Sequence, residues 1–417
     1  MSWTNEDHLL LYCCRTEIDY RIKDKIIETR RNNIDWDFFL KKTRENGISG
    51  IVYLKLNEKK NDCLNIPSII FEELKKDYYL NATKNTLIFE ELGKVLKAFK
   101  KSGLQVIVLK GAALAETVYG NLALRSMSDV DLLVKKEDLY QIDEQLKILG
   151  YSPWDRAVND IDLSSTAYLT TLDYRSSSRN SFSFHIHWHF VNSTVPNEYY
   201  INNIKMEDIW QDAEKTDIAH VETLVMAPHH LLIHLSEHAL RVTHSLGKLS
   251  FFCDINESIN FYQKRLDWDR LIKDSFKFGL DRIVYLTLYF TSGFLAAKIP
   301  GDVLLKLRPK RFSLSERIFI NSISNNNRFP NLSYIVHLSM NKGLFKKMQF
   351  VGRTLFPPRQ IIAQRSYTSP SKVGPTYYLQ RINEVFSCLF KIMAHFWRYF
   401  LNNRPSFLSA WPSLRRP

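Results

Sequence analysis

The 417-residue sequence lacks the features of a secreted or membrane-spanning protein. It contains no run of about 18 uncharged apolar residues, and no basic start followed by the apolar stretch of a signal peptide. Its five cysteines form no CxxC pair and their number is odd. This pattern argues against a disulfide framework or a zinc site and fits a reducing compartment. We therefore predict a cytoplasmic protein.

Acidic residues are nearly absent from the C-terminal part of the chain. Residues 301–417 contain 19 Lys and Arg but only 3 Asp and Glu, whereas residues 1–300 hold 38 basic and 41 acidic residues. Such asymmetry is typical of a segment that meets an anionic partner, such as phospholipid, nucleic acid or an acidic substrate. A basic surface with no single partner explains it equally well.

Helical and strand patterns divide the chain into four regions. Residues 1–100 have the apolar spacing of helices, interrupted by the helix-ending pair Asn46-Gly47. Residues 101–212 contain two short strands, LQVIVLKG and MSDVDLLVKKED, each followed by a helix, and then two alternating runs joined by SSSRN that predict a hairpin. From Ala213 to about residue 300 the pattern is helical again. Residues 301–417 are rich in Pro, Ser and Asn, which predicts loops before a final amphipathic helix.

The order of these patterns predicts the fold class. A strand, a helix, a second strand, a second helix and a hairpin within about 90 residues describe a small mixed sheet. We therefore predict an α+β protein, in which a mixed-sheet core over residues 101–212 is flanked by N-terminal and C-terminal helical regions.

Two aspartates in the second predicted strand are the first candidates for chemistry. Side chains alternate between the faces of a strand, so Asp129 and Asp131 share one face while Val130 and Leu132 point into the core. Two neighbouring carboxylates repel unless a cation lies between them, and Mg²⁺ binds carboxylate oxygens together with substrate phosphates. The motif alone leaves open a solvated strand edge.

The first predicted strand ends in Lys110 and Gly111 and runs directly into a helix. A glycine turn at a helix start offers free backbone N–H groups to a phosphate, and Lys110 can add a positive charge. Arg125 precedes the aspartates and can pair with them or with phosphate, although a plain surface arginine is an equal alternative.

These motifs together resemble a known family. The stretch VIVLKGAALAETVYGNLALRSMSDVDLLV is similar to an uncharacterised bacterial nucleotidyltransferase-like family with a Leu-Lys-Gly, Tyr and Arg-x-x-x-Asp-x-Asp signature, within the DNA polymerase beta superfamily. NIDWDFFLKKTRENGISGIVY is also similar to the N-terminal helices of that family, and FHIHWHF and LLIHLSEHALR are similar to its later parts, so the likeness extends from residue 1 to about residue 300.

The resemblance implies a polymerase-beta-like core and a nucleotidyltransferase that uses Mg²⁺ or Mn²⁺ to move a nucleoside monophosphate from ATP or another NTP. The acceptor stays unidentified: a small molecule, a sugar, a peptide or a protein. Asp129 and Asp131 would hold the metal. Lys110, Gly111, Arg125 and Ser128 would bind the nucleotide.

One position departs from the superfamily pattern. The resemblance places a third carboxylate where this chain has His185. Alternation puts His185, His187 and His189 on one strand face, and we include His185 and His187 among the catalytic candidates, because a neutral imidazole can act as a base or bind Mn²⁺. The alternative is a catalytically weakened fold that serves as a nucleotide-binding, membrane-binding or partner-binding scaffold.

Two further histidines, His234 and His238, lie four residues apart and share a helix face. They are candidates for side chains that face the active edge of the sheet and contact the catalytic residues, and a purely structural role is the alternative. "HLSEH" lacks the HExxH order of a zinc protease. In the same region we expect Arg241 and Asp254 to form a buried salt bridge.

The final helix combines aromatic and basic residues. Its polar positions fall in one stripe on an otherwise apolar cylinder: Ser387, Lys391, His395, Arg398 and Asn402. Such a helix either docks against the protein body or lies peripherally in a membrane interface beside anionic lipids. Nucleic-acid binding ranks third, because the basic residues form no known module.

Overall fold

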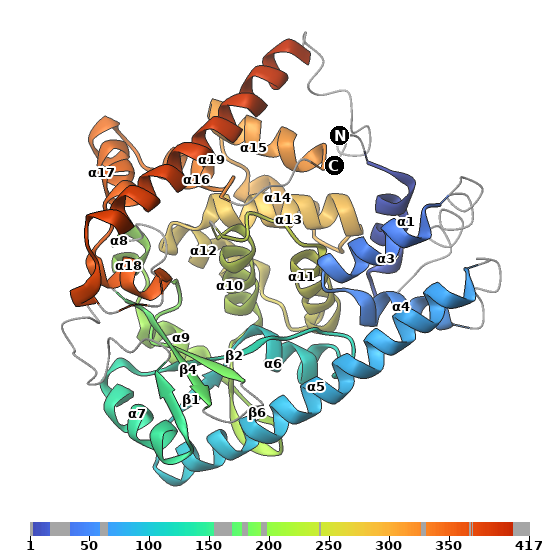
Figure 1. Ribbon diagram of the computed structural model, residues 1–417, viewed down its shortest axis with the longest axis vertical. Helices are drawn as coiled ribbons and strands as arrows, with labels where there is room; N and C mark the ends of the chain where they lie inside the picture. Colours follow the sequence, from blue (N-terminus) through green and yellow to red (C-terminus); the bar gives the residue numbers. More distant parts are fainter. Residues whose placement is uncertain are drawn as a thin grey trace.

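The computed structural model describes residues 3–16, 34–58, 66–153, 169–176, 182–192, 198–241, 243–326, 331–366, 368 and 370–402. Within these residues, helices surround one seven-stranded mixed sheet (Figure 1). The protein is therefore a mixed α/β structure. The long helix α5 (Ser68–Lys101) and the helix α7 (Leu139–Ile148) cover one face of the sheet, and α10 (Pro228–Leu240) and α11 (Leu249–Tyr262) lie on the opposite side.

The strands follow the order β3-β4-β5-β2-β1-β7-β6 across the sheet. Their bounds are Val106–Val108 (β1), Asp129–Val134 (β2), Tyr151–Pro153 (β3), Thr171–Ser176 (β4), Ser183–His187 (β5), Glu214–Ile218 (β6) and Val221–Val225 (β7). β2 is antiparallel to β1 and parallel to β5, and β5 is antiparallel to β4. The predicted hairpin is confirmed by the β4–β5 pairing, although residues 177–181 between these strands lie outside the described part.

The alternation predicted for β2 is confirmed. Val130, Leu132 and Val134 belong to the core that α5 (Ser68–Lys101) and α7 (Leu139–Ile148) complete. Leu133 faces the other way and joins the core formed with the helices after the sheet. Since side chains alternate along a strand, Asp129 and Asp131 lie on the Leu133 side.

The N-terminal helices agree with the sequence pattern. Before α5 come α1 (Asn5–Cys13), α3 (Trp36–Glu45) and α4 (Ser49–Asn57). The predicted break is real: Gly47 between α3 and α4 has a φ of +67°, a left-handed conformation that costs glycine little.

The region from Ala213 onward differs from the prediction at its start. We expected helix there, but β6 and β7 form an antiparallel hairpin that extends the sheet beside β1. Each strand has only five residues, too few for the alternation of Val221, Thr223 and Val225 to stand out from a helical pattern. The expected helices follow: α10 (Pro228–Leu240), α11 (Leu249–Tyr262), α12 (Trp268–Phe278) and α13 (Asp281–Leu295). Two short helices, α8 (Glu198–Asn203) and α9 (Met206–Asp212), precede the hairpin.

The C-terminal region is more helical than predicted. The expected final helix exists as α19 (Pro375–Asn402), but the preceding segment is not mainly loops. It forms α14 (Gly301–Leu307), α15 (Leu314–Ser324), α16 (Tyr334–Met340), α17 (Leu344–Leu355) and α18 (Arg359–Ser366). Some of the described Ser and Asn residues lie at the ends of these helices: Ser313 and Ser333 precede α15 and α16, and Asn341 follows α16. No helix in the described part is long and apolar enough to cross a membrane.

Candidate functional site

Three adjacent strands bring the aspartates and histidines together. In the register of the sheet, Asp131 on β2 pairs with His185 on β5, and His185 pairs with Asp173 on β4. The face of β5 that carries His185 and His187 is therefore on the same side of the sheet as Asp129 and Asp131. His189 does not join this row: β5 ends at His187, and Nδ1 of His189 accepts a hydrogen bond from the backbone N–H of Val191.

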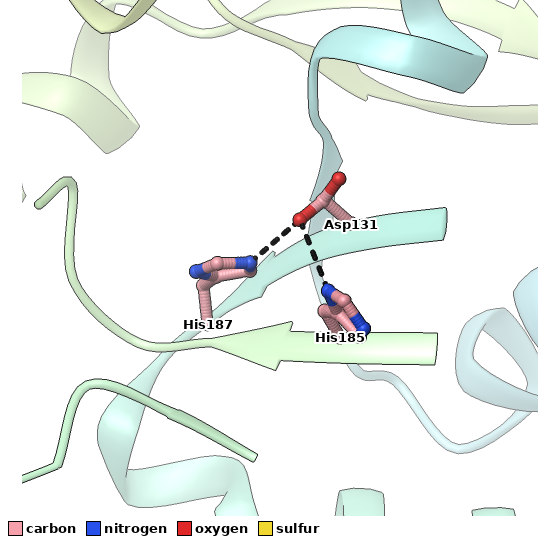
Figure 2. Close-up of side chains that lie close together, drawn as sticks. All are labelled: Asp131, His185 and His187. Carbon is pink, nitrogen blue, oxygen red and sulfur yellow. Dashed lines mark hydrogen bonds and ion pairs between the residues drawn. The ribbon is translucent and has the colours of Figure 1, made fainter. Parts of the chain in front are cut away.

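Asp131 is the buried centre of the site, with a side chain only 4% exposed. Lys110 Nζ lies 2.9 Å from its Oδ2, and His187 Nε2 lies 2.8 Å from its Oδ1. Figure 2 shows His185 and His187 both directed at this carboxylate. Burial alone would raise the pKa of Asp131, but Lys110, His185 and His187 hold it well below its usual range. Asp131 is therefore a carboxylate anion.

His185 lies between carboxylates. Its Nδ1 is 3.1 Å from Asp129 Oδ2 and 3.7 Å from Asp131 Oδ1, and its Nε2 is 3.6 Å from Asp173 Oδ1. Burial alone would lower the pKa of His185, but the hydrogen bond and charge of Asp131, with the charges of Asp173 and Asp129, raise it to about 9. The ring is therefore an imidazolium at neutral pH, and it places a positive charge between the two carboxylates of β2.

His187 differs from its neighbour in charge. It is fully buried, and burial lowers its pKa, so the ring is neutral and Nε2–H donates to the Asp131 carboxylate. Two histidines two residues apart thus have opposite pKa shifts. His185 touches several carboxylates and is partly solvated, whereas His187 has one carboxylate partner and lies close to the positive charge of Lys110.

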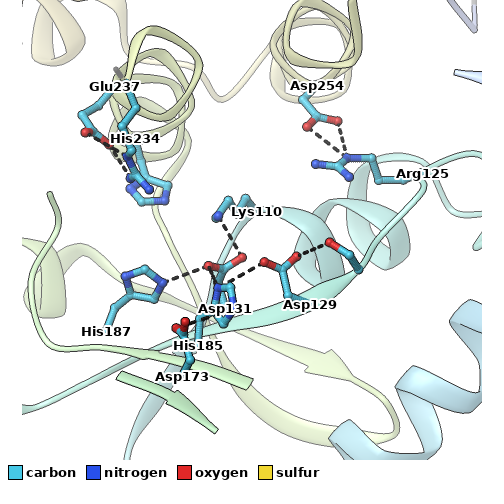
Figure 3. Close-up of polar contacts among 12 residues, drawn as sticks. Lys110, Arg125, Asp129, Asp131, Asp173, His185, His187, His234, Glu237 and Asp254 are labelled. Atoms are coloured by element: carbon cyan, nitrogen blue, oxygen red, sulfur yellow. Dashed lines mark hydrogen bonds and ion pairs between the residues drawn. The ribbon is translucent and has the colours of Figure 1, made fainter. Parts of the chain in front are cut away.

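Figure 3 shows Lys110 directly above Asp131, and Gly111 follows it in the same turn. Lys110 has a positive φ of 21°, a conformation that L-residues rarely adopt, at the start of α6 (Lys110–Ala113). Such strained residues persist where the surrounding structure fixes them, often at functional sites. A side chain at Gly111 would meet Sδ of Met127 at 3.3 Å, so this turn packs closely against the segment that leads into β2.

The row of polar residues opens into a cavity of about 740 Å³. Asp129, Asp131 and Asp173 are its acidic lining residues within the described chain. The basic lining residues are more numerous: Arg44, Lys84, Lys110, Arg125, Arg241, Lys248 and Arg365. In the described part, neither Lys84 nor Lys248 forms a salt bridge, and both are exposed. The cavity therefore combines a cluster of carboxylates with an excess of positive charge.

Arg125 and Ser128 lie at the edge of this cavity. Ser128 Oγ donates to Asp129 Oδ1 at 3.1 Å. Arg125 Nε donates to both oxygens of Asp254, at 2.9 and 3.0 Å. The expected Arg241–Asp254 pair is therefore wrong: Arg241 pairs with Glu237 at 2.8 Å, one turn earlier on its own helix. Asp254 on α11 faces the loop before β2, where Arg125 is closer.

The sequence decides the family. Residues 32–296 match the model of a family described as uncharacterised nucleotidyltransferase, which is more than half of the chain. The protein belongs to this nucleotidyltransferase family. No curated protein matches the chain.

Two solved structures share a distant likeness. One is the antibiotic-resistance factor ANT(2'')-Ia, with 12% identity and a TM-score of 0.31, covering 50% of this chain and 98% of that one. The other is an antigenic nucleotidyltransferase-like protein from Paracoccidioides brasiliensis, with 14% identity and a TM-score of 0.33, covering 52% of this chain and 96% of that one. Neither likeness is close enough to define the fold, and the family assignment rests on the sequence match.

In this member of the nucleotidyltransferase family, the side chains of the site have the chemistry to bind a divalent cation. Asp129 and Asp131 present carboxylate oxygens on one face, and the imidazolium of His185 already lies between them. That protonated ring marks a place where positive charge is stabilised. Carboxylate oxygens are the ligands that Mg²⁺ and Mn²⁺ prefer.

His234 and His238 take different places in this nucleotidyltransferase. His234 is buried, its Nδ1 lies 3.2 Å from the carbonyl oxygen of Phe190, and burial lowers its pKa to about 3. It does not line the cavity. His238 does, and it stacks on His244 with ring centroids 4.5 Å apart, while Phe251 packs edge-on against it. The sequence does not indicate this aromatic wall, because His244 and Phe251 follow α10 without a recognisable motif.

Two other contributions to the site were missed. Asp173 supplies a third carboxylate on the strand next to His185, and its place opposite His185 depends on the register of the β4–β5 hairpin. Gln364 and Arg365 of α18 line the cavity, and Gln364 Nε2 donates to the carbonyl oxygen of Thr171 at 2.8 Å. These two residues lie outside the matched family region. The C-terminal region of this chain therefore helps to form the pocket.

Proposed function

We propose that the protein is a metal-dependent nucleotidyltransferase that moves a nucleoside monophosphate from ATP or another NTP to an unidentified acceptor. The acceptor is a small molecule, a sugar, a peptide or a protein with a free hydroxyl. The observation that carries the proposal is the pair of carboxylates on β2, held on one face beside a cavity rich in lysine and arginine. A polymerase-beta-like arrangement of the core is part of the same proposal.

In this proposal, Asp129 and Asp131 hold Mg²⁺ or Mn²⁺, and the basic residues bind the triphosphate. When bound, the ion neutralises phosphate charge and polarises the α-phosphate. Lys84 and Lys248 are the available positive charges, because Lys110 and Arg125 also neutralise Asp131 and Asp254. Gly111 and Ser128 border the space next to the carboxylates and would contact phosphate. His238, His244 and Phe251 form an aromatic wall of the cavity, and a nucleobase would stack on one of these rings.

The reaction needs a group that accepts a proton. The acceptor oxygen attacks the α-phosphorus, the bond to pyrophosphate breaks, and the hydroxyl proton leaves the acceptor. His185 already carries a proton at neutral pH, and His187 is buried. Asp173 is the remaining carboxylate in the described cavity lining, and its side chain is 29% exposed. We assign the proton to Asp173, with His185 positioning this carboxylate.

Binding and chemistry can be tested separately. Mg²⁺ with ATP, GTP, CTP or UTP should raise the melting temperature of the wild-type protein, since a ligand that binds only the folded state stabilises it. Asp173→Asn should retain that shift but transfer label from NTP about a hundredfold more slowly, the usual contribution of a general base. Differential scanning fluorimetry and radiolabel transfer measure the two effects. No thermal response to any metal–nucleotide pair would instead support a scaffold that has lost nucleotide binding.

A second proposal concerns the membrane. We propose that the protein acts in the cytoplasm and contacts an anionic membrane surface through α17 and α19. Large apolar side chains are exposed along both helices and at Phe356, directly after α17: Leu344, Phe345, Met348, Val351, Phe356, Leu379, Phe386, Leu389, Phe390, Met393 and Trp397. Figure 1 shows the two helices side by side at one end of the molecule. Of the α19 polar stripe, the side chains of His395, Arg398 and Asn402 lie outside the described part.

The lysines beside these apolar side chains favour an anionic membrane as the partner of this surface. Lys346 and Lys347 are exposed between the apolar residues of α17, and Lys391 is exposed beside Phe390 on α19. Amphipathic helices with exposed apolar and basic residues bind anionic lipids at the membrane interface. Nucleic acid remains the less favoured partner, because bulky aliphatic side chains do not match a phosphate backbone.

Liposome co-sedimentation tests the membrane proposal. Phe345→Glu with Phe390→Glu should reduce binding to phosphatidylserine vesicles at least about tenfold, since two large apolar groups leave the interface and two negative charges enter it. Ile148→Glu, at an equally exposed apolar position on α7, is the matched control and should bind as the wild type does. Equal binding of all three proteins, or equal binding to neutral and anionic vesicles, would reject this surface as the anchor.

A further inference from the structure

Two adjacent histidines lie buried outside the pocket described above. His229 and His230 occupy the first turn of α10, and their side chains are 5% and 1% exposed. Within the described chain, Nε2 of His229 and Nδ1 of His230 are buried without a hydrogen-bond partner. A buried polar atom without a partner costs free energy, so these rings need a compensating contact.

Two carboxylates from other helices face these rings. Asp212 is the last residue of α9, and Asp274 lies on α12. His229 Nε2 is 3.5 Å from Asp212 Oδ2 and 3.6 Å from Asp274 Oδ2. His230 Nε2 is 3.4 Å from Asp274 Oδ2. One potential ligand atom from each of Asp212, His229 and His230 lies within 4.8 Å of the others.

These separations decide between hydrogen bonds and shared coordination. Hydrogen bonds between nitrogen and oxygen are about 2.7–3.2 Å long, shorter than all three distances. Two ligands of a tetrahedral ion, each about 2.0–2.2 Å from the metal, lie about 3.3–3.6 Å from each other. The distances from His229 to Asp212 and Asp274 therefore match atoms that share an ion.

Arg270 supports one of these carboxylates. Its guanidinium donates to Oδ2 of Asp212, and metal-binding carboxylates commonly accept such a second hydrogen bond.

We propose that Asp212, His229, His230 and Asp274 form a metal site separate from the nucleotidyl-transfer site. The mixture of imidazole and carboxylate suits a divalent transition-metal ion, zinc above all, more than Mg²⁺ or Ca²⁺. The ligands come from three helices, so the ion joins α9, α10 and α12. This proposal does not depend on the proposed transferase activity.

Zinc content tests the site. The wild-type protein, loaded with zinc and exchanged into zinc-free buffer, should retain about one zinc ion per chain by elemental mass spectrometry. His229→Ala with His230→Ala should retain at least tenfold less. His220→Ala is the control, because His220 is exposed on the β6–β7 turn and should not change zinc content.

Further variants separate this site from the pocket and from a folding defect. Asp131, His185 and His187 form another group with metal-ligand spacing. Asp131→Asn should keep the zinc. Asp274→Asn preserves side-chain shape, and it should lose most of the increase in melting temperature that zinc gives the wild type. Wild-type protein without retained zinc, or zinc lost from Asp131→Asn but kept without His229 and His230, would overturn the proposal.

Discussion

Replacing both Asp129 and Asp131 by asparagine is expected to reduce nucleotidyl transfer at least about a thousandfold. The change removes the two carboxylates that we assign to the metal, and a thousandfold loss corresponds to about 4 kcal/mol of transition-state stabilisation. Label transfer from an NTP measures the effect. Asp217→Asn, on the exposed surface of β6, is the matched control and should transfer at the wild-type rate.

The two aspartates differ in their structural importance. Asp131 is buried and compensates the charge of Lys110, so its replacement also destabilises the fold. Asp129 has a side chain 31% exposed, and its replacement alone should leave the protein folded. Asp129→Asn therefore tests the assignment without a folding defect. Wild-type transfer by this single variant and by the folded double variant would show that β2 does not hold the catalytic metal.

The features that could be predicted from the sequence depend on local periodicity. Alternation along β2 placed Asp129 and Asp131 on one face because side chains on a strand have a period of two residues. The same argument put His185 and His187 together on β5. Helix limits such as Asn46-Gly47 were also local, since a single left-handed glycine ends a helix.

The features that could not be predicted depend on contacts between distant segments. Asp173 is part of the site only because the hairpin register sets it opposite His185. Arg365 and Gln364 reach the cavity from a helix almost two hundred residues beyond β4, and no local pattern indicates that approach. The sequence predicted a histidine, His185, in place of the third carboxylate. The structure has His185 at that position on β5, but Asp173 on the neighbouring strand β4 supplies a third carboxylate.

The charge of the site follows from the same long-range packing. The sequence identified His185 and His187 as similar candidates for a base, but the structure gives them different protonation states. His185 contacts Asp129, Asp131 and Asp173 and gains a proton, whereas His187 is fully buried and stays neutral. Protonation thus depends on neighbours that belong to two other strands, and a sequence motif alone does not specify it.

Replacing Asp254 by alanine is the second change with a large expected effect, and its effect is on stability. Asp254 is buried, and its two carboxylate oxygens share the single N–H of Arg125 Nε, while Oδ1 also accepts a hydrogen bond from the hydroxyl of Tyr119 at 3.0 Å. Arg125 is itself largely buried, with a side chain 16% exposed. Removing one partner of such a pair leaves an uncompensated charge, which typically costs about 3–5 kcal/mol of unfolding free energy.

This ion pair joins the two halves of the pocket. Arg125 belongs to the segment that leads into β2, and Asp254 belongs to α11 in the helical region (Figure 3). Urea unfolding of Asp254→Ala should therefore show the loss, and Asp254→Asn should lose less because it keeps a hydrogen-bond acceptor. Asp269→Ala is the control: Asp269 pairs with Lys306 but is 88% exposed, so its loss should cost less than about 1 kcal/mol. If Asp254→Ala unfolds at the same urea concentration as this control, the Arg125 pair does not stabilise the connection between sheet and helices.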